Sequence, residues 1–174
     1  MNHLLNRTTD RDRRLHLLNH WVDQIRGTFY TQVMFAEFEW GIHRRAEAGE
    51  PLTHDVLSRL FGELYMRYHG PQIVNDELHL CGWSRIPHFY YDFYVYQYAT
   101  GWAAASALTQ RILDEGEPAL TPYLQFLQSG CRAYPIELLQ GAGVDMGQPG
   151  PITQTVRVFD RLIDEMEELL SGGA

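Results

Sequence analysis

Two histidines that lie four residues apart could hold a metal ion. In the run His16-Leu17-Leu18-Asn19-His20 both imidazoles fall on one face of a predicted helix, which is the spacing of the ligands on a zinc-binding helix. A catalytic site of that kind also needs a glutamate directly after the first histidine, to take the proton from metal-bound water. The chain has Leu17 at that position. We therefore favour two ordinary surface histidines over a metal site here.

A second group of side chains that could do acid–base chemistry is formed by Glu37, Glu39 and His43. Glu39 and His43 are also four residues apart and would share one face of a helix. The run from Phe29 to Trp40 is apolar almost all round, so one of these glutamates is expected to be partly buried. A buried carboxylate needs a partner, and we favour structural pairing over chemistry for this group.

The densest concentration of polar aromatic side chains lies in the run Ile86–Gly101, which reads IPHFYYDFYVYQYATG. If this run is helical from Phe89, three of its tyrosines share one stripe, with an imidazole at its start. Phenol hydroxyls need buried partners or a wet cleft, and phenol and imidazole donors can stabilise a developing oxyanion. The run is a candidate both for the core and for the wall of a cleft. Its candidate site residues are His88, Tyr91, Tyr94 and Tyr98.

The elements that must position these side chains are predicted to be helices. Apolar residues recur at helical spacing along most of the chain, and no segment alternates convincingly between apolar and polar residues, so the predicted fold class is all-α. Thr53 is the predicted N-cap of the second helix. The predicted helices cover residues 13–48, 53–68, 89–115, 118–127, 135–141 and 152–170, and residues 74–83 could form another.

The size and charge of the chain exclude several classes of function. Its 174 residues, 45% of them hydrophobic, suffice for one compact core. A formal net charge of −8 and the lack of a basic run argue against a nucleic-acid partner. The two cysteines form no CxxC pair, which favours a reducing cytoplasm, and no apolar run is long enough to cross a membrane.

Six runs of the sequence carry a resemblance to a known family. They are Leu17–His20, Arg26–Tyr30, Met34–Glu39, Ile86–Gly101, Tyr134–Leu139 and Ala142–Met146. Together they resemble the C-terminal part of oligoendopeptidase F, the bacterial branch of the thimet oligopeptidase family of zinc metallopeptidases, and the resemblance covers nearly the whole chain. It implies that residues 1–174 form a single segment, the C-terminal helical portion of a zincin-type oligopeptidase catalytic domain.

The resemblance implies a mostly helical cytoplasmic enzyme that cleaves short peptides with one zinc ion. In the family the metal is held by a His-Glu-x-x-His helix and by a Glu on the following helix, and this chain contains no His-Glu-x-x-His. We therefore expect this chain alone to bind no zinc and to show no measurable peptidase activity. Met1 falls within what resembles a family helix, which favours a truncated or split enzyme over an independent domain.

The part that is present corresponds to the wall of the cleft that faces the zinc. The resemblance implies that His88 and tyrosines of this run hold the oligopeptide substrate and donate hydrogen bonds to the tetrahedral intermediate. The matching positions are His88, Tyr91, Tyr94 and Tyr98, with Tyr90 and Tyr96 as substitutes. An N-terminal half that carries the zinc site is the expected partner, and self-association through exposed apolar surface is open. Two alternatives remain: a free-standing helical module that binds peptides or partners without catalysis, and a gene fragment with no selected role.

Overall fold

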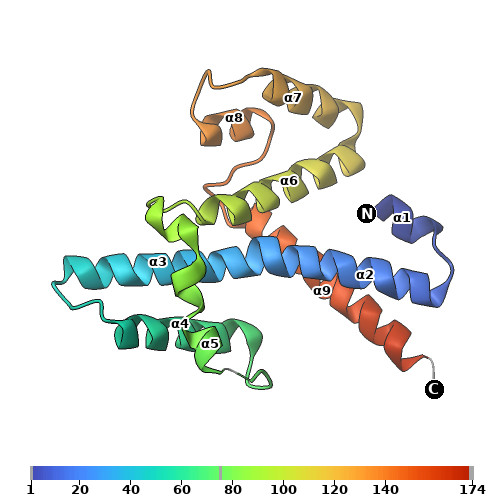
Figure 1. Cartoon of the computed structure of the whole chain (residues 1–174). Helices are drawn as coiled ribbons and strands as arrows, with labels where there is room; N and C mark the ends of the chain where they lie inside the picture. The colour runs from blue at the N-terminus through green and yellow to red at the C-terminus, as the bar shows by residue number, and fades with distance from the viewer. Residues whose placement is uncertain (1, 75, 173–174) are drawn as a thin grey trace. The chain divides into compact units, whose positions relative to one another are not determined.

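The computed structural model describes residues 2–74 and 76–172, and in these ranges the chain is helical and contains no strand. The predicted all-α class is confirmed. In chain order the elements are α1 (Asn2–Arg7), α2 (Arg11–Ile25), η1 (Arg26–Tyr30), α3 (Thr31–Glu47), α4 (His54–His69), α5 (Glu77–Leu80), η2 (Gly82–Arg85), η3 (Pro87–Tyr90), α6 (Tyr96–Glu115), α7 (Glu117–Gln128), α8 (Pro135–Gly141) and α9 (Gly150–Ser171). Figure 1 labels the α-helices of the described residues, and the short helical turns η1, η2 and η3 lie between them in the chain.

The chain divides into two compact units, each with apolar residues buried inside it. The first unit comprises residues 1–26 and 100–174, and the second comprises residues 27–99. In the first unit α2 packs on α9, with Leu18, Ile25 and Leu162 buried. Arg14 of α2 forms an ion pair with Glu165 of α9. A smaller cluster in the same unit contains Ala107, Leu108, Ala142 and Val144.

The predicted helix over residues 13–48 is present but is interrupted near its middle. The Asp10 side chain caps its start by accepting a hydrogen bond of 2.8 Å from the backbone N–H of Arg13. The interruption is η1, a π-helical turn over Arg26–Tyr30 that contains Gly27. Glycine is a poor helix former, and π-turns within α-helices are local departures from regular geometry. The helical period was thus predicted correctly on both sides of the turn.

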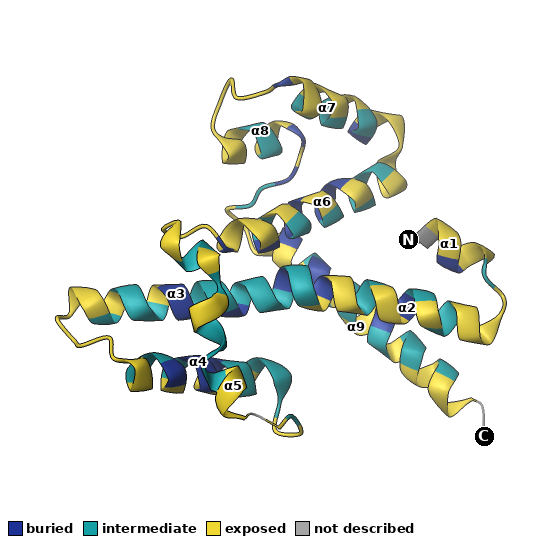
Figure 2. Ribbon diagram, in the orientation of Figure 1, coloured by how far each residue is buried: buried dark blue, intermediate teal, exposed yellow. Residues whose placement is uncertain are grey.

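The core of the second unit lies between α3 and α4. These helices run antiparallel and side by side in Figure 1, and Figure 2 shows buried positions on both. Thr53 caps α4 as predicted, because its hydroxyl accepts a hydrogen bond from the backbone N–H of Val56. Phe89 belongs to the later segment that leads to α6, and its ring contacts Phe35 and Phe38. The buried residues of this core are Met34, Phe38, Phe61 and Leu64.

The prediction of a helix that starts at Phe89 is wrong. Residues Pro87–Tyr90 form only a short 3₁₀ turn, and α6 begins at Tyr96. Between them the backbone of Asp92 and Phe93 adopts left-handed φ angles of 50° and 56°, which a right-handed helix cannot accommodate. Residues 74–83, where the sequence allows a helix, contain α5 and the start of the short turn η2, and residue 75 lies outside the described residues.

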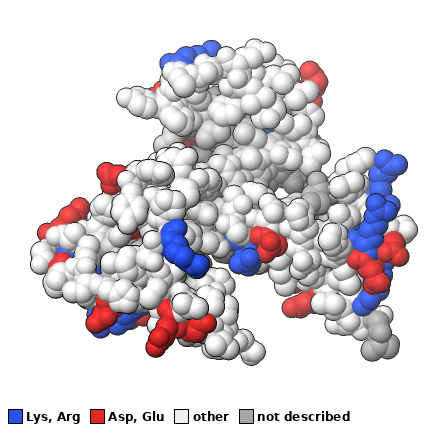
Figure 3. Space-filling view, viewed as in Figure 1, with Lys and Arg blue, Asp and Glu red and all other residues white. Residues whose placement is uncertain are grey.

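No helix in the described ranges has the length and apolar character needed to cross a membrane. On the face seen in Figure 3, acidic and basic side chains are interspersed among larger uncharged areas.

Candidate functional site

The structure brings together four side chains that the sequence singled out, and we call His88, Tyr91, Tyr94 and Tyr98 the His88 cluster. The ring of Tyr94 stacks on the imidazole of His88, with centroids 5.8 Å apart and planes at 25°. Tyr91 and Tyr98 approach the same imidazole edge to face, at 6.1 and 5.7 Å. Three phenol rings therefore surround one imidazole, although no helical stripe connects them.

Hydrogen bonds link the polar ends of the cluster. The hydroxyl of Tyr98 lies 3.2 Å from Nε2 of His88. Partial burial raises the pKa of Tyr98, and a hydrogen bond with the Tyr94 side chain raises it further. A phenol with a raised pKa keeps its proton at neutral pH. The Tyr98 hydroxyl is thus a neutral hydrogen-bond donor.

The cluster remains accessible to water. Tyr98 and Tyr94 are 37% and 38% exposed, and Tyr91 is 62% exposed. The two substitutes named from the sequence, Tyr90 and Tyr96, are also exposed, but the ring contacts of His88 are made with Tyr91, Tyr94 and Tyr98. Exposed phenols beside an imidazole can bind the amide groups of a peptide and donate to an oxygen that gains negative charge.

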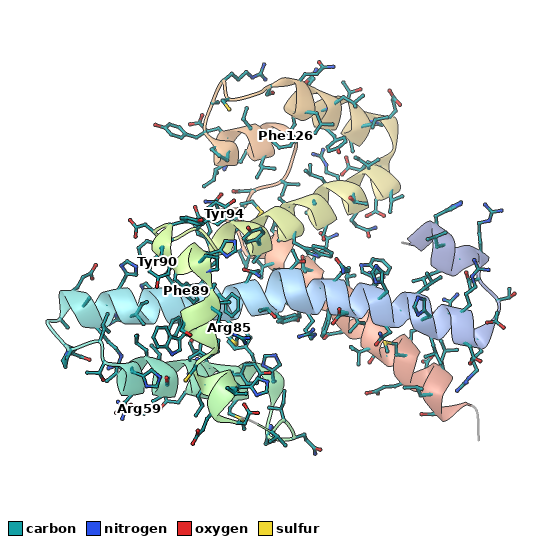
Figure 4. The ribbon with its side chains drawn as sticks, in the orientation of Figure 1. Arg59, Arg85, Phe89, Tyr90, Tyr94 and Phe126 are labelled. Atoms are coloured by element: carbon teal, nitrogen blue, oxygen red, sulfur yellow. The ribbon has the colours of Figure 1, made fainter. Side chains whose placement is uncertain are left out.

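Three short pieces of backbone position the cluster. Pro87 starts the 3₁₀ turn that carries His88, because its fixed φ suits the first position of a helical turn. The Asp92-Phe93 turn separates Tyr91 from Tyr94, and the first turn of α6 carries Tyr98. Figure 4 labels Phe89, Tyr90 and Tyr94 along this segment. Phe89 anchors the segment on α3 through its ring contacts with Phe35 and Phe38.

The Asp92-Phe93 turn is held from α3. Oε1 of Glu39 accepts a hydrogen bond of 2.8 Å from the backbone N–H of Phe93, and the Glu39 side chain is 1% exposed. One helical turn further along α3, the His43 ring packs on the Phe93 ring with centroids 4.3 Å apart. Nε2 of His43 lies 3.8 Å from a carboxylate oxygen of Asp92. The prediction of a buried and paired glutamate is confirmed for Glu39.

The neighbouring Glu37 is also paired, with different partners. It forms an ion pair with Arg67 and accepts a hydrogen bond of 2.9 Å from the Tyr68 hydroxyl, both on α4. Burial, the hydrogen bond to Glu37 and the negative charge of Glu37 raise the pKa of Tyr68 to about 12. Glu37 therefore connects two helices of the core, as the structural interpretation of this group predicted.

The donor side chains do not fit a zinc ion. His16 and His20 both lie exposed on α2. Within residues 2–74 and 76–172, no group of three or more His, Cys, Asp or Glu side chains is arranged to hold a metal ion. A zinc site needs at least three protein ligands. The pair of histidines on α2 therefore lacks the further ligands that a site would require.

Sequence reasoning missed one contact between reactive side chains. Sγ of Cys81 lies 3.3 Å from Nε2 of His54, and Ser58 contacts the same sulfur at 4.0 Å. Cys81 and His54 are 27 residues apart in sequence. No local motif could have found this contact, because it forms only when the segment after α5 folds back on α4.

The sequence model of peptidase family M3 matches residues 1–158 of the chain. The chain belongs to this family. Peptidase family M3 is a family of zinc metallopeptidases. The resemblance to oligoendopeptidase F that the six runs indicated is thereby confirmed at the level of the family.

Individual relatives give the same result. This chain is 50% identical over 168 residues to oligopeptidase PepF of Bacillus subtilis, and the alignment covers 97% of this chain and 25% of that protein. It is 41% identical over 170 residues to the plasmid oligoendopeptidase F of Lactococcus lactis subsp. cremoris, covering 98% of this chain and 28% of the relative. The chain thus spans about a quarter of the length of the curated relatives that it matches.

A solved structure also matches this chain. The crystal structure of oligoendopeptidase-F from Enterococcus faecium superimposes with a TM-score of 0.91 at 43% sequence identity. The match covers 97% of this chain and 33% of that one. The helical arrangement found here therefore occurs as part of a longer oligoendopeptidase chain.

Proposed function

We propose that this chain is the substrate-binding and oxyanion-stabilising part of a zinc metalloendopeptidase that hydrolyses short peptides. The observation that carries the proposal is the His88 cluster, in which water-accessible phenols surround one imidazole. The names of the relatives support the reaction class, since they are oligopeptidases and oligoendopeptidases.

The chemistry of the cluster suits the second half of peptide hydrolysis. When a nucleophile attacks a peptide carbonyl, the oxygen gains negative charge, and donors that are already in place stabilise it. Tyr91, Tyr94, Tyr98 and His88 offer such donors. The Tyr98 phenol keeps its proton throughout the neutral range, since even an unshifted tyrosine ionises only near pH 10 and the pKa of Tyr98 is raised further. The same donors bind the carbonyl groups of a peptide before reaction.

The proposal assigns the metal to another part of the enzyme. Since the donors described here do not fit zinc, we propose that an N-terminal half supplies the zinc site and that this chain alone is inactive. The proposal places the enzyme in the cytoplasm, because Cys81 and Cys131 are both free. Self-association belongs to the same proposal, since large apolar side chains such as Leu113, Leu127 and Ile136 are exposed.

The proposal is tested with the purified chain and a short quenched fluorescent peptide. We expect no hydrolysis with added zinc or with a chelator, together with binding of the same labelled peptide that His88→Ala weakens. Fluorescence increase measures the hydrolysis, and polarisation measures the binding. Hydrolysis that a chelator abolishes would contradict the proposal and would direct mutagenesis to His16 and His20. Failure of the peptide to bind would contradict the substrate-binding role.

A second candidate function is a free-standing helical module that binds peptides without catalysis. The same water-accessible cluster supports it. The two candidate functions predict different results for a chimera in which this chain replaces the matching segment of Bacillus subtilis PepF. A chimera that hydrolyses the peptide in a zinc-dependent manner supports the enzyme part, whereas a folded chimera that binds the peptide without cleaving it supports the binding module.

A further inference from the structure

We propose that Glu39 is a positioning residue for the His88 cluster: its buried carboxylate holds the Asp92-Phe93 turn and thereby fixes Tyr91 and Tyr94 against His88. Glu39 is not among the donors assigned to the substrate and would act only through the turn. The inference rests on the proposed function, because it concerns the same cluster.

The turn has a conformation that its own residues do not favour. Asp92 and Phe93 are consecutive residues with φ angles of 50° and 56°. Aspartate visits this left-handed region with some ease, whereas a bulky aromatic residue seldom does. Backbone in such a conformation persists only where the surrounding structure imposes it. Some contact outside the turn must therefore hold Phe93.

Glu39 provides that contact. Its Oε1 accepts a hydrogen bond of 2.8 Å from the backbone N–H of Phe93. The carboxyl group needs the bond as well, since Glu39 is 1% exposed and a buried polar group without a partner is unfavourable. His43, on the same helix, covers the Phe93 ring and faces Asp92. Both residues of the turn are thus held from α3.

The position of the turn makes Glu39 matter for the cluster. Tyr91 directly precedes the turn and Tyr94 directly follows it, and their rings lie 6.1 Å apart. Both rings contact His88. If Asp92 and Phe93 relaxed to ordinary φ angles, the chain would leave the turn in another direction, and the two rings could not both remain on the imidazole.

Two substitutions separate the positioning role from a general contribution to folding. Glu39→Gln keeps the side-chain shape and a carbonyl oxygen that can accept the Phe93 hydrogen bond. Glu39→Met keeps a similar volume but removes the acceptor. Glu37→Gln is the matched control, because Glu37 lies on the same helix and pairs with Arg67 and Tyr68 rather than with the turn.

The measurements are made on the full chain by NMR. In the unmodified chain, we expect the Phe93 amide to exchange with solvent about fivefold more slowly than an open amide, as a typical intramolecular hydrogen bond implies. We expect Glu39→Met to remove this protection and the nuclear Overhauser contacts of His88 with Tyr91 and Tyr94, while the helical circular dichroism remains. Glu39→Gln and Glu37→Gln should retain the ring contacts.

Two results would overturn the inference. One is an unprotected Phe93 amide in the unmodified chain, a measurement that needs no variant to fold. The other is a folded Glu39→Met chain whose His88 ring contacts are intact. Neither measurement uses a peptide or zinc, so the outcome is separate from the test of the proposed function. If the peptide does not bind but Glu39→Met still loses the ring contacts of His88, the proposed function is contradicted and the positioning role of Glu39 is supported.

Discussion

The histidines of α2 and the histidine of the His88 cluster show how differently two regions can use the same side chain. His16 and His20 have the regular spacing of metal ligands, yet both point to solvent from an uninterrupted helix. His88 and its tyrosines are also spaced as on one helical stripe, but the segment that carries them is not a continuous helix, and three tyrosine rings surround the imidazole. Regular spacing places residues on one face of a helix, but the solvent-exposed face of α2 does not enclose its two imidazoles.

The difference comes from the backbone that carries each region. A continuous helix places side chains four residues apart on one face but does not surround them, so a site on it needs donors from another element. The segment from η3 to α6 changes direction twice within a few residues, at the 3₁₀ turn and at Asp92-Phe93. Side chains that are close in sequence can then converge on one imidazole. Irregular backbone is therefore where this chain gathers its polar aromatic groups.

The largest expected effect contrasts the two regions by their contribution to hydrolysis. In the chimera with Bacillus subtilis PepF, replacement of Tyr91, Tyr94 or Tyr98 by Phe, one at a time, should in at least one case lower kcat by about 10²–10³-fold, the effect of removing one oxyanion donor. His16→Ala and His20→Ala should each change the activation free energy calculated from kcat/KM by no more than about 0.5 kcal/mol, as expected for surface substitutions. Steady-state kinetics with a quenched peptide measures both.

The comparison would break if the α2 histidines proved to be the important ones. Three tyrosine variants with unaltered kcat, or a large loss of kcat in His16→Ala, would show that the regular pair and not the cluster serves the reaction. A rise in KM with kcat unchanged in the tyrosine variants would instead restrict the cluster to substrate binding.

A smaller effect tests the backbone on which the comparison depends. Asp92→Val should lower the free energy of unfolding by about 1–2 kcal/mol, because a β-branched residue is poorly suited to the left-handed region. Asp92→Asn should change it by less than about 0.5 kcal/mol, since asparagine tolerates this conformation and has the same size. Urea unfolding followed by circular dichroism measures both. Equal stability of the two variants would show that Asp92 is not held at a left-handed φ in solution.

Much of the helical framework could be predicted from local sequence. Apolar periodicity located α2, α3, α4 and α9, and Thr53 was the correct N-cap, because these features depend on residues within a few positions of each other. The burial of either Glu37 or Glu39 could also be predicted, since the run around them is apolar on nearly every face, but only the structure shows that it is Glu39.

The turn at Asp92-Phe93 could not be predicted in the same way. Residues 88–100, which include the turn, contain no glycine or proline, and their aromatic side chains are compatible with a helix. What ends the helical pattern is a hydrogen bond from Phe93 to a carboxylate 54 residues earlier in the chain. The contact between His54 and Cys81 escaped prediction for the same reason. Family resemblance pointed to the members of the His88 cluster, but only the folded segment shows which rings meet.

The smallest expected effect compares a tyrosine of the cluster with one outside it. Tyr68 has a pKa raised to about 12 by burial and by Glu37, whereas an unfolded tyrosine ionises near 10.0. Between these two values the unfolded chain loses a proton that folded Tyr68 keeps, so the free energy of unfolding should fall as the pH rises through this window. Tyr68→Phe should remove that part of the fall, as urea unfolding at several pH values will show.

Tyr98 should respond to Tyr94 and not to Glu37. Its pKa is raised by partial burial and then by the hydrogen bond with Tyr94, so Tyr94→Phe should move the pKa of Tyr98 back toward its ordinary value. Glu37→Gln should lower the pKa of Tyr68 and leave Tyr98 unchanged. Phenolate absorbance, with each tyrosine assigned by its Phe variant, follows both titrations. A Tyr98 titration that is insensitive to Tyr94→Phe would mean that the two phenols are not joined, and the cluster would then be a set of separate rings around His88.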